Sequence, residues 1–258
     1  MRRRRLQRRL QALPGYFADF DPNADAVFSD SGATTPSTVT GNVRNIKDWR
    51  WRNGVGYAFT NGAGTPPTWE TFNPNQNGLK FANAGAQLAG NASILPYSTN
   101  RSGLTLISVT TLPASGGATK RAIFISRNAS GSVRAGSNVV SGDLYQIQSR
   151  SGDSDAAQTT GSVATYSGGT TVVRIDVFDY AGGTQKTYID GTEVISGTPA
   201  WGAAATDVTD STEVFLSGQS GSVYYIDGWF MRVIFLSEAI PAWMVGYYTT
   251  LLKIHYGL

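Results

Sequence analysis

Few side chains in this sequence have the types and spacing needed for acid–base or nucleophilic chemistry. The chain of 258 residues has no cysteine and one histidine, His255, three residues from its end. A cysteine nucleophile and a disulfide are therefore excluded, and a zinc site or a histidine-based catalytic triad would depend on this single imidazole. We interpret His255 as a structural or solvent-exposed residue.

The carboxylates do not form the pattern of a glycoside hydrolase. Such an enzyme needs two carboxylates that flank one bond, and on one face of a strand they would lie two residues apart. The four glutamates have no acid at that spacing; they are Glu70, Glu193, Glu213 and Glu238. Asp19/Asp21 and Asp153/Asp155 have the spacing but lie in segments that we predict to be loops. The sequence therefore predicts a protein that is not an enzyme, with a polysaccharide-degrading enzyme as the alternative.

The stretch "DPNADAVFSDSG" begins like an EF-hand calcium loop. Asp21, Asn23 and Asp25 occupy positions 1, 3 and 5 of such a loop. However, Ala26 stands where the loop needs glycine, and Gly32 stands where it needs glutamate. An EF-hand is therefore excluded, and we expect no cofactor.

Aromatic side chains in polar, turn-rich segments indicate carbohydrate binding. Flat rings stack on the C–H groups of a sugar, while neighbouring polar groups bond its hydroxyls. The aromatic candidates are Trp49, Trp51, Trp69, Tyr97 and Trp201. The polar candidates, which we predict to face outward from strands and to line an open sheet face, are Gln146, Gln148, Arg174 and Asp176. The alternative is that the rings cover the ends of a β-sandwich and that the polar face is only solvated.

Six of the first nine residues are arginine, and they form a basic N-terminal arm. They are Arg2, Arg3, Arg4, Arg5, Arg8 and Arg9. The chain has 21 basic and 18 acidic residues, so 21 − 6 = 15 basic residues remain and leave the body with a net charge of −3. A nucleic-acid-binding body would carry the positive charge on its own surface.

We predict that residues 1–14 are an anchor that ends at Pro14-Gly15. Arginine forks pair bidentately with carboxylates, and a segment that orders on binding can wrap a partner. The expected partner is a larger protein assembly, a capsid or a tail. Nucleic acid is an alternative partner of the arm alone.

The sequence predicts neither a membrane span nor a signal peptide. The most apolar stretch, "GWFMRVIFLSEAIPAWMVGYY", is interrupted by Arg232, Glu238 and Pro241, short of the roughly 20 residues that a span needs. No apolar segment follows the arginines, as it would in a signal peptide. We expect no membrane partner.

Most of the remaining chain shows the pattern of short strands. Apolar and polar residues alternate over 144–149 and 171–180, and Asp190-Gly191 suits a type I′ hairpin turn. Thirty glycines and a charged fraction of 15% fit many strands joined by tight turns. These features predict an all-β fold, a two-sheet sandwich or jelly roll.

One short helix is predicted at the C-terminus, after Pro241. Its apolar stripe consists of Trp243, Tyr247, Leu251 and Ile254, at helical spacing. Gly257 follows where a C-terminal capping glycine belongs.

Four segments, in this order, carry a family resemblance: "GLKFANAGAQLAG", "LTLISVTTLP", "VVRIDVFDYAGGTQKTYIDGTEV" and "IDGWFMRVIFLSEAIPAWMVGYYTTLLKIHYGL". They resemble the strands, the hairpin and the closing strand and helix of concanavalin A-like (laminin G-like) jelly-roll domains of bacterial surface and phage virion proteins. The resemblance covers about residues 16–258 and implies one such domain over 15–258. Arg232 departs from it, because many relatives carry an acid there. A fold of this kind does not fix a function.

The resemblance also implies a possible calcium site. Many laminin G-like domains bind calcium through scattered aspartates and carbonyl groups. In this chain Asp143, Asp153 and Asp155 would be the contributors.

Together these features predict a virion-associated protein: a phage head-decoration protein, head fibre or tail adhesin. It would be docked by its arm and would display a glycan-binding domain on the virion surface. A bacterial cell surface is the alternative location, and a purely structural decoration protein without ligand is the alternative function. The sequence also allows a homo-oligomer.

Overall fold

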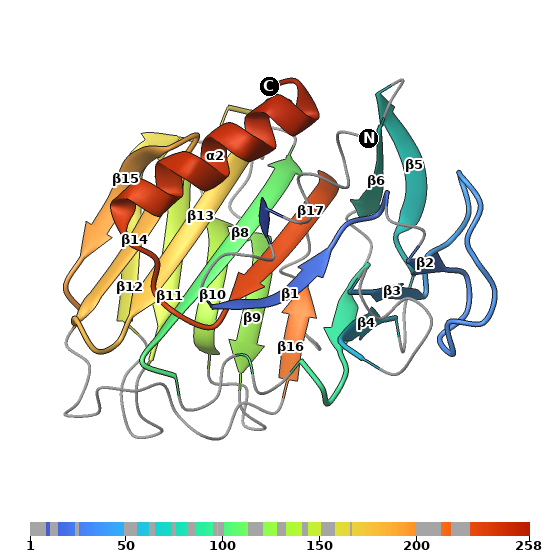
Figure 1. Cartoon of the computed structure of the whole chain (residues 1–258), viewed down its shortest axis with the longest axis horizontal. Coiled ribbons are helices and arrows are strands. Elements are labelled where there is room, and N and C mark those ends of the chain that lie inside the picture. Colours follow the sequence, from blue (N-terminus) through green and yellow to red (C-terminus); the bar gives the residue numbers. More distant parts are fainter. Residues whose placement is uncertain are drawn as a thin grey trace.

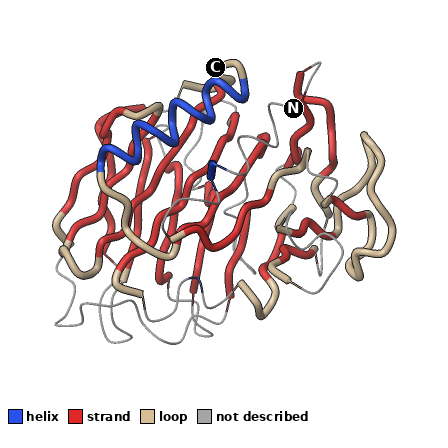
Figure 2. Tube along the Cα trace, viewed as in Figure 1, coloured by secondary structure: helices blue, strands red, loops and turns tan. Residues whose placement is uncertain are grey.

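Side chains that alternate between two faces build two antiparallel sheets in the computed structural model of the protein (Figures 1 and 2). The structure describes residues 9–10, 15–23, 26–48, 56–61, 65–73, 76–81, 86–94, 97, 101–112, 121–127, 133–140, 144–150, 158–165, 167–199, 213–217 and 228–258. The fold predicted from the sequence, an all-β sandwich with one C-terminal helix, is confirmed.

Sheet A has eight strands and lies under the helix (Figure 1). Its order is β15-β14-β13-β8-β17-β6-β5, and β1 pairs with β17. The bounds are β1 Tyr16–Phe20, β5 Thr68–Asn73, β6 Gln76–Phe81, β8 Gly103–Thr111, β13 Thr171–Asp179, β14 Thr184–Ile189, β15 Thr192–Gly197 and β17 Gly228–Leu236. The predicted turn between β14 and β15 is present, since φ is 51° at Asp190 and 87° at Gly191.

Sheet B has nine strands in the order β12-β11-β10-β9-β16-β7-β4-β3-β2. Their bounds are β2 Val27–Phe28, β3 Asn45–Lys47, β4 Ala58–Thr60, β7 Leu88–Gly90, β9 Arg121–Arg127, β10 Val133–Val140, β11 Leu144–Ser149, β12 Gln158–Thr165 and β16 Glu213–Leu216. Every pairing in both sheets is antiparallel among the named strands, as a sandwich of hairpins requires.

The inner core lies between the two sheets and is rich in aromatic rings. Phe20 and Phe59 pack edge to face with centroids 4.8 Å apart, and both contact Phe235. Tyr97 packs on the same phenylalanine at 4.7 Å and donates its hydroxyl to the carbonyl oxygen of Thr105 at 2.8 Å. Burial of these large rings is a main source of the stability of the sandwich.

The outer core lies between sheet A and helix α2 (Ala242–Tyr256). Val173 and Ile175 of β13 point toward the helix, whereas Val172 and Phe178 of the same strand belong to the inner core. Sheet A is therefore covered on both faces where α2 crosses it, and its central strands are buried throughout.

Helix α2 is present as predicted, but it packs through a different face. Its buried side chains are Met244, Val245, Tyr248, Thr249, Leu252 and Tyr256. In the predicted stripe, Trp243 is 71% exposed and Ile254 is 76% exposed. Both faces of the helix are apolar, so spacing alone could not tell which of them meets the sheet. Gly257 ends the helix with φ of 70°, as predicted.

The predicted arm lies mostly outside the described residues, since only Arg9 and Leu10 of residues 1–14 are described. Arg9 is exposed, and Leu10 is fully buried in the outer core. At least one residue of the predicted arm is thus part of the folded body. Among the described residues, no helix has the length and apolar character to span a membrane.

Candidate functional site

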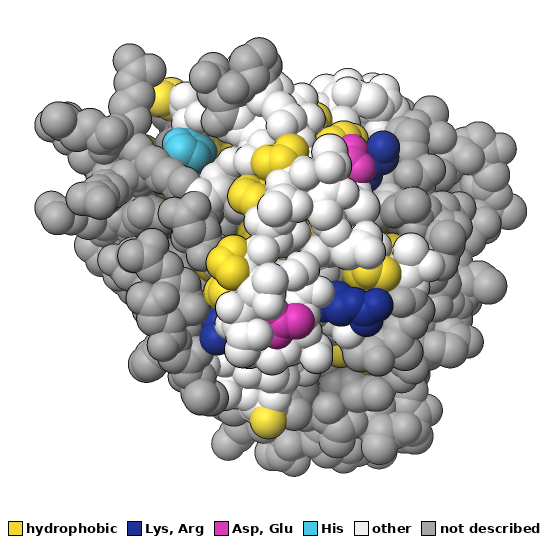
Figure 3. All heavy atoms as spheres, turned by 90° about the vertical axis from the view of Figure 1, so that its right-hand side faces the viewer, with side chains coloured by type: hydrophobic (Ala, Val, Ile, Leu, Met, Phe, Trp, Pro, Cys, Tyr) yellow, Lys and Arg dark blue, Asp and Glu magenta, His cyan; other side chains and the backbone are white. Residues whose placement is uncertain are grey.

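The outer face of sheet A continues past the C-terminal end of α2, and there its side chains change character. We call this region the edge patch; it consists of Glu70, Phe72, Gln76, Lys80, Trp229 and His255. All six are half-buried. Figure 3 views the molecule from the side on which β5 and β6 lie in Figure 1.

Strand register brings these side chains together from distant parts of the chain. Lys80 of β6 pairs with Trp229 of β17 on one side and with Thr68 of β5 on the other. Glu70 pairs with Gly78. Paired residues share a face of the sheet. Because Leu79 and Phe81 point into the inner core, Lys80 points outward.

An aromatic pair forms the floor of the edge patch. The rings of Phe72 and Trp229 meet edge to face, with centroids 5.6 Å apart. Gly78 makes room for the indole, because a Cβ at that position would lie 3.3 Å from Cε3 of Trp229. Lys80 places Nζ 5.5 Å from the centroid of the Trp229 ring. Such rings offer a flat apolar surface beside polar groups.

Charged and amide groups surround this floor. The side chains of Lys80 and Glu70 are 44% and 29% exposed and form an ion pair of 3.6 Å. Gln76 donates through Nε2 to the carbonyl oxygen of His255 at 2.9 Å, which joins the β5–β6 hairpin to the last turn of α2. The His255 ring packs edge to face on Tyr256, with centroids 4.8 Å apart. His255 is thus half-buried in the last turn of α2, at the border of the edge patch.

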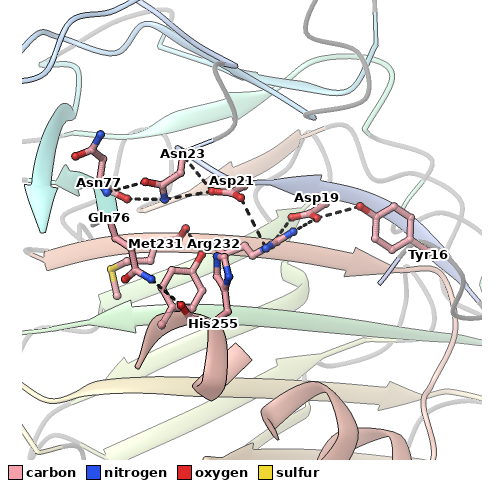
Figure 4. Close-up of polar contacts among 10 residues, drawn as sticks. Tyr16, Asp19, Asp21, Asn23, Gln76, Asn77, Met231, Arg232 and His255 are labelled. Carbon is pink, nitrogen blue, oxygen red and sulfur yellow. Dashed lines mark hydrogen bonds and ion pairs between the residues drawn. The ribbon is translucent and has the colours of Figure 1, made fainter. Parts of the chain in front are cut away.

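A buried ionic network lies behind the edge patch (Figure 4). Arg232 Nε donates to Asp19 Oδ1 at 2.8 Å, and Nη2 donates to the second oxygen of the same carboxylate. Nη1 lies 3.7 Å from Asp21 Oδ2, and Tyr16 donates its hydroxyl to Asp19 at 3.0 Å. All three charged side chains are fully buried. Although burial acts to lower it, the charges of Asp19 and Asp21 raise the pKa of Arg232 well above its ordinary value.

Arg232 occupies a junction along one edge of β17. The pairing of β17 with β6 ends at Phe230, and its pairing with β1 begins at Val233. The arginine lies between the two, next to a register shift against β8. Arg232, which departs from the family pattern, therefore forms an ion pair with Asp19 of β1. This ion pair links β17 to β1 at the point where the pairing with β6 has ended.

The segment that resembled the start of a calcium loop has a structural role. Asn23 donates to the carbonyl oxygen of Asn77 at 2.9 Å and accepts from its N–H at 2.7 Å, and Asp21 accepts from the N–H of Asn23 at 2.9 Å (Figure 4). These bonds hold the end of β1 against the hairpin that carries the edge patch. In the described part of the chain, no three metal-ligating side chains gather into a site. Asp143, Asp153 and Asp155 lie outside the described residues.

Several residues predicted to bind carbohydrate lie elsewhere. Tyr97 is fully buried in the inner core and is corrected to a core residue. Trp69 is half-buried and packs on the inner core through the same face as its partner Leu79. Trp49, Trp51 and Trp201 fall outside the described residues, as do Arg2, Arg3, Arg4, Arg5 and Arg8.

The predicted open face of Gln146, Gln148, Arg174 and Asp176 is divided between two surfaces. Arg174 and Asp176 are fully buried and point between the sheets, where Arg174 Nε bonds both oxygens of Asp176 at 3.1 and 2.9 Å. This corrects the prediction that they line an open face. Alternation along β13 was read rightly, but it cannot show that both faces of the strand are covered. Gln146 and Gln148 are half-buried and do point outward, on sheet B.

Sequence reasoning missed Phe72, Gln76, Lys80 and Trp229. Lys80 and Trp229 lie in two of the segments that carry the family resemblance, where they were given no role of their own. A weak signal existed at Lys80, because this lysine interrupts an apolar run between the core residues Leu79 and Phe81. Only the strand order brings them to one place.

Comparisons with solved structures find the same fold in several proteins. Trypanosoma rangeli sialidase in complex with sialic acid matches 98% of this chain and 37% of its own, with 11% identity and a TM-score of 0.62. A mutant of NanB sialidase from Streptococcus pneumoniae matches 66% of this chain and 27% of its own, with 16% identity and a TM-score of 0.54. Botulinum neurotoxin type C, studied for its interaction with two ganglioside molecules, matches 72% of this chain and 44% of its own, with 11% identity and a TM-score of 0.50.

These likenesses show the fold, and this chain spans less than half the length of each of these proteins. No family model matches the sequence, and neither does any curated protein. The expectation that the protein is not an enzyme is corrected, because enzymes, the sialidases, share its fold over nearly the whole chain. At this low identity the likeness assigns no activity to the chain.

Proposed function

We propose that this protein is a glycan-binding β-sandwich and that the edge patch is its binding surface. The carrying observation is the half-buried pair of Phe72 and Trp229, framed by Lys80, Glu70 and Gln76 on the stretch of sheet A beyond the end of α2. An indole face stacks on sugar C–H groups, and the surrounding carboxylate, ammonium and amide groups bond hydroxyls.

The fold neighbours support this class of ligand. One is described in complex with sialic acid and another by its interaction with gangliosides, which are glycans or carry them. The edge patch offers one cation and one anion within 3.6 Å of each other, so it suits a sugar with a polar or charged substituent next to its hydroxyls.

A glycan array on the purified protein tests the proposal, followed by titration of the best ligand. Trp229→Leu removes the indole and should weaken binding at least tenfold. Trp243→Ala is the matched control, since Trp243 is an exposed tryptophan on the outer face of α2. If Trp229→Leu bound as tightly as the wild type, or if the array were silent, the proposal would fail.

The virion location is a second, finer part of the proposal, supported by charge alone. Six arginines precede a body of net charge −3, so the arm suits the acidic surface of a capsid or tail. Because Leu10 is part of the outer core, the test should leave it in place. Replacing Arg2, Arg3, Arg4 and Arg5 by Ser should abolish incorporation into particles while the body stays folded; normal incorporation would contradict this part.

A further inference from the structure

The side of α2 that faces away from sheet A is apolar and exposed. The helix crosses the outer side of the sheet, and its inner side is packed there (Figure 1). A helix with apolar side chains all round is usually buried all round. We call the exposed side the helix face and define it by the exposed residues of α2, which are Ala242, Trp243, Gly246, Tyr247, Thr250 and Ile254.

No residue of the helix face carries a charge. Lys253, beside the face, is half-buried and forms an ion pair of 3.6 Å with Asp190. The Thr250 hydroxyl donates to the carbonyl oxygen of Gly246 at 2.8 Å, so it is satisfied within the helix. The arginines of the predicted arm therefore find no carboxylate on this face, and an acidic partner finds no cation. The helix face fits an uncharged apolar partner.

Gly246 makes a notch in the helix face. A Cβ at this position would meet no atom within 4 Å, so packing within the chain does not require a glycine. Glycine in the interior of a helix lowers the stability of the helix, and its place on the exposed side therefore needs another reason. Ile254 projects from the same side of the helix, because positions 246, 250 and 254 are four residues apart.

The notch and the projecting isoleucine are complementary in an antiparallel pair of helices. Gly246 lies four residues before Thr250, and Ile254 lies four residues after it. A twofold axis at Thr250 therefore sets Ile254 opposite the partner's Gly246. By the same count Trp243 lies opposite the partner's Gly257, where a Cβ would also meet no atom within 4 Å. A twofold interface requires a surface that is complementary to itself in this way.

The exposed apolar area is large enough for such a pair. Trp243 is 71%, Ile254 76%, Leu258 42% and Tyr247 37% exposed. With about 150–250 Å² for a whole side chain, these four expose roughly 450 Å² in one copy and roughly 900 Å² in two. The small residues between them bring the pair to about 1,000 Å², the lower limit of a specific interface, so we expect a weak dimer with a dissociation constant in the micromolar range.

We propose that the helix face is the interface of a homodimer in which α2 packs antiparallel on α2 of a second copy. Trp243 and Ile254 are its apolar anchors, and Gly246 allows the two helices to approach closely. Below the dissociation constant the chain is a monomer in which both anchors are exposed. Replacing either of them by alanine then leaves unfolding nearly unchanged, as expected for exposed residues.

Sedimentation equilibrium of the full chain without glycan tests the dimer, at concentrations from about 1 to 200 μM that bracket a micromolar dissociation constant. The mass should rise from 27.5 kDa toward twice that value. Ile254→Glu places a charge against the partner helix and should raise the dissociation constant at least tenfold. Val39→Ser, which removes an exposed apolar side chain outside the helix, is the control and should leave it unchanged. A mass of 27.5 kDa at every concentration, or an equally tight dimer of Ile254→Glu, would overturn the proposal.

Gly246→Gln separates a role in the interface from a role in the helix. Glutamine favours the helix more than glycine does, so the midpoint of unfolding of the monomer should rise. The same side chain fills the notch, so the dissociation constant should rise at least tenfold. A higher midpoint with an unchanged dissociation constant would show that the dimer forms through another surface and would overturn the proposal.

A lipid surface is the other occupant that an apolar helix face could meet. Flotation with phosphatidylcholine vesicles tests this, and the wild type should stay in the protein fraction. Vesicle binding that Ile254→Glu abolishes, by a chain that is monomeric at every concentration, would assign the face to lipid and overturn the dimer. Because no glycan is present in these experiments, their outcome is independent of the edge patch.

Discussion

The outer face of sheet A has two regions, one covered by α2 and one beyond the C-terminal end of this helix, and they differ in composition. Under α2 the strands present aliphatic side chains such as Ile107, Val173, Ile175 and Val177, all buried. Beyond the end of α2 the same face presents Trp229 and its charged and amide neighbours, half-buried. The helix accounts for this difference in side-chain type. Side chains under α2 need only apolar area and a shape that packs, whereas side chains beyond the helix can include groups that bind a ligand.

The boundary is marked by a buried charge pair rather than by apolar packing. Arg232 and Asp19 lie where β1 replaces β6 along the edge of β17, next to the end of α2. An apolar pair of equal volume could be as stable there. The ion pair instead fixes one geometry for the strands that carry the edge patch.

The largest effect is expected at the boundary itself. Arg232→Met leaves the Asp19 carboxylate buried without its partner, so the free energy of unfolding should fall by about 3–5 kcal/mol. Denaturant unfolding followed by circular dichroism measures this. The double variant with Asp19→Asn removes the unpaired charge and should recover part of the loss. Equal loss in the single and double variants would mean that the charge pair does not hold the junction.

The covered side should respond to loss of apolar volume. Leu252→Ala opens a cavity under α2 and should lower the free energy of unfolding by about 3 kcal/mol. Ile254→Ala on the exposed side of the same helix is the control, with an expected change within about 0.5 kcal/mol. The reverse order of the two effects would show that the stripe predicted from the sequence meets the sheet after all.

The uncovered side should respond in binding and not in stability. Glu70→Gln removes the anion of the edge patch and should weaken glycan binding by about 1 kcal/mol, roughly fivefold. Unfolding should change by less than about 1 kcal/mol because the ion pair is partly exposed. Glu193→Gln is the control: it breaks a similar surface pair, with Lys186, far from the patch in sequence. Equal binding losses in the two variants would point to overall charge instead of the patch.

The smallest effect is expected for Trp243→Ala. This indole is 71% exposed on α2, so its loss should change neither unfolding by more than about 0.5 kcal/mol nor glycan affinity. Denaturant unfolding followed by circular dichroism and titration with the glycan measure the two quantities. A marked loss of affinity would move the binding surface from the edge patch to the helix.

Much of the fold could be predicted because its signals are local. Alternation marked β11 and β13, Asp190-Gly191 marked the β14–β15 turn, and Gly257 marked the end of α2. The orientation of α2 could not be predicted, because both of its faces are apolar. The burial of Arg174 could not be predicted either, since a strand pattern does not reveal a second covering layer.

The candidate site was almost invisible in the sequence for a topological reason. Its residues come from β5, β6, β17 and the last turn of α2. Lys80 of β6 and Trp229 of β17 are more than 140 residues apart in the sequence. They meet only because β6 pairs with β17 at the edge of sheet A. Turn-rich tryptophans drew attention instead, and Trp69, the described one among them, packs on the inner core.

The most direct test of the central claim is the indole N–H region of a nitrogen-15 spectrum during glycan titration. The chain has six tryptophans, and the Trp229 signal is assigned as the one missing from the spectrum of Trp229→Leu. We predict that the glycan selected on the array shifts the Trp229 signal and leaves that of Trp243 in place. A glycan that binds while the Trp229 signal does not move would contradict the assignment of the edge patch as the binding surface.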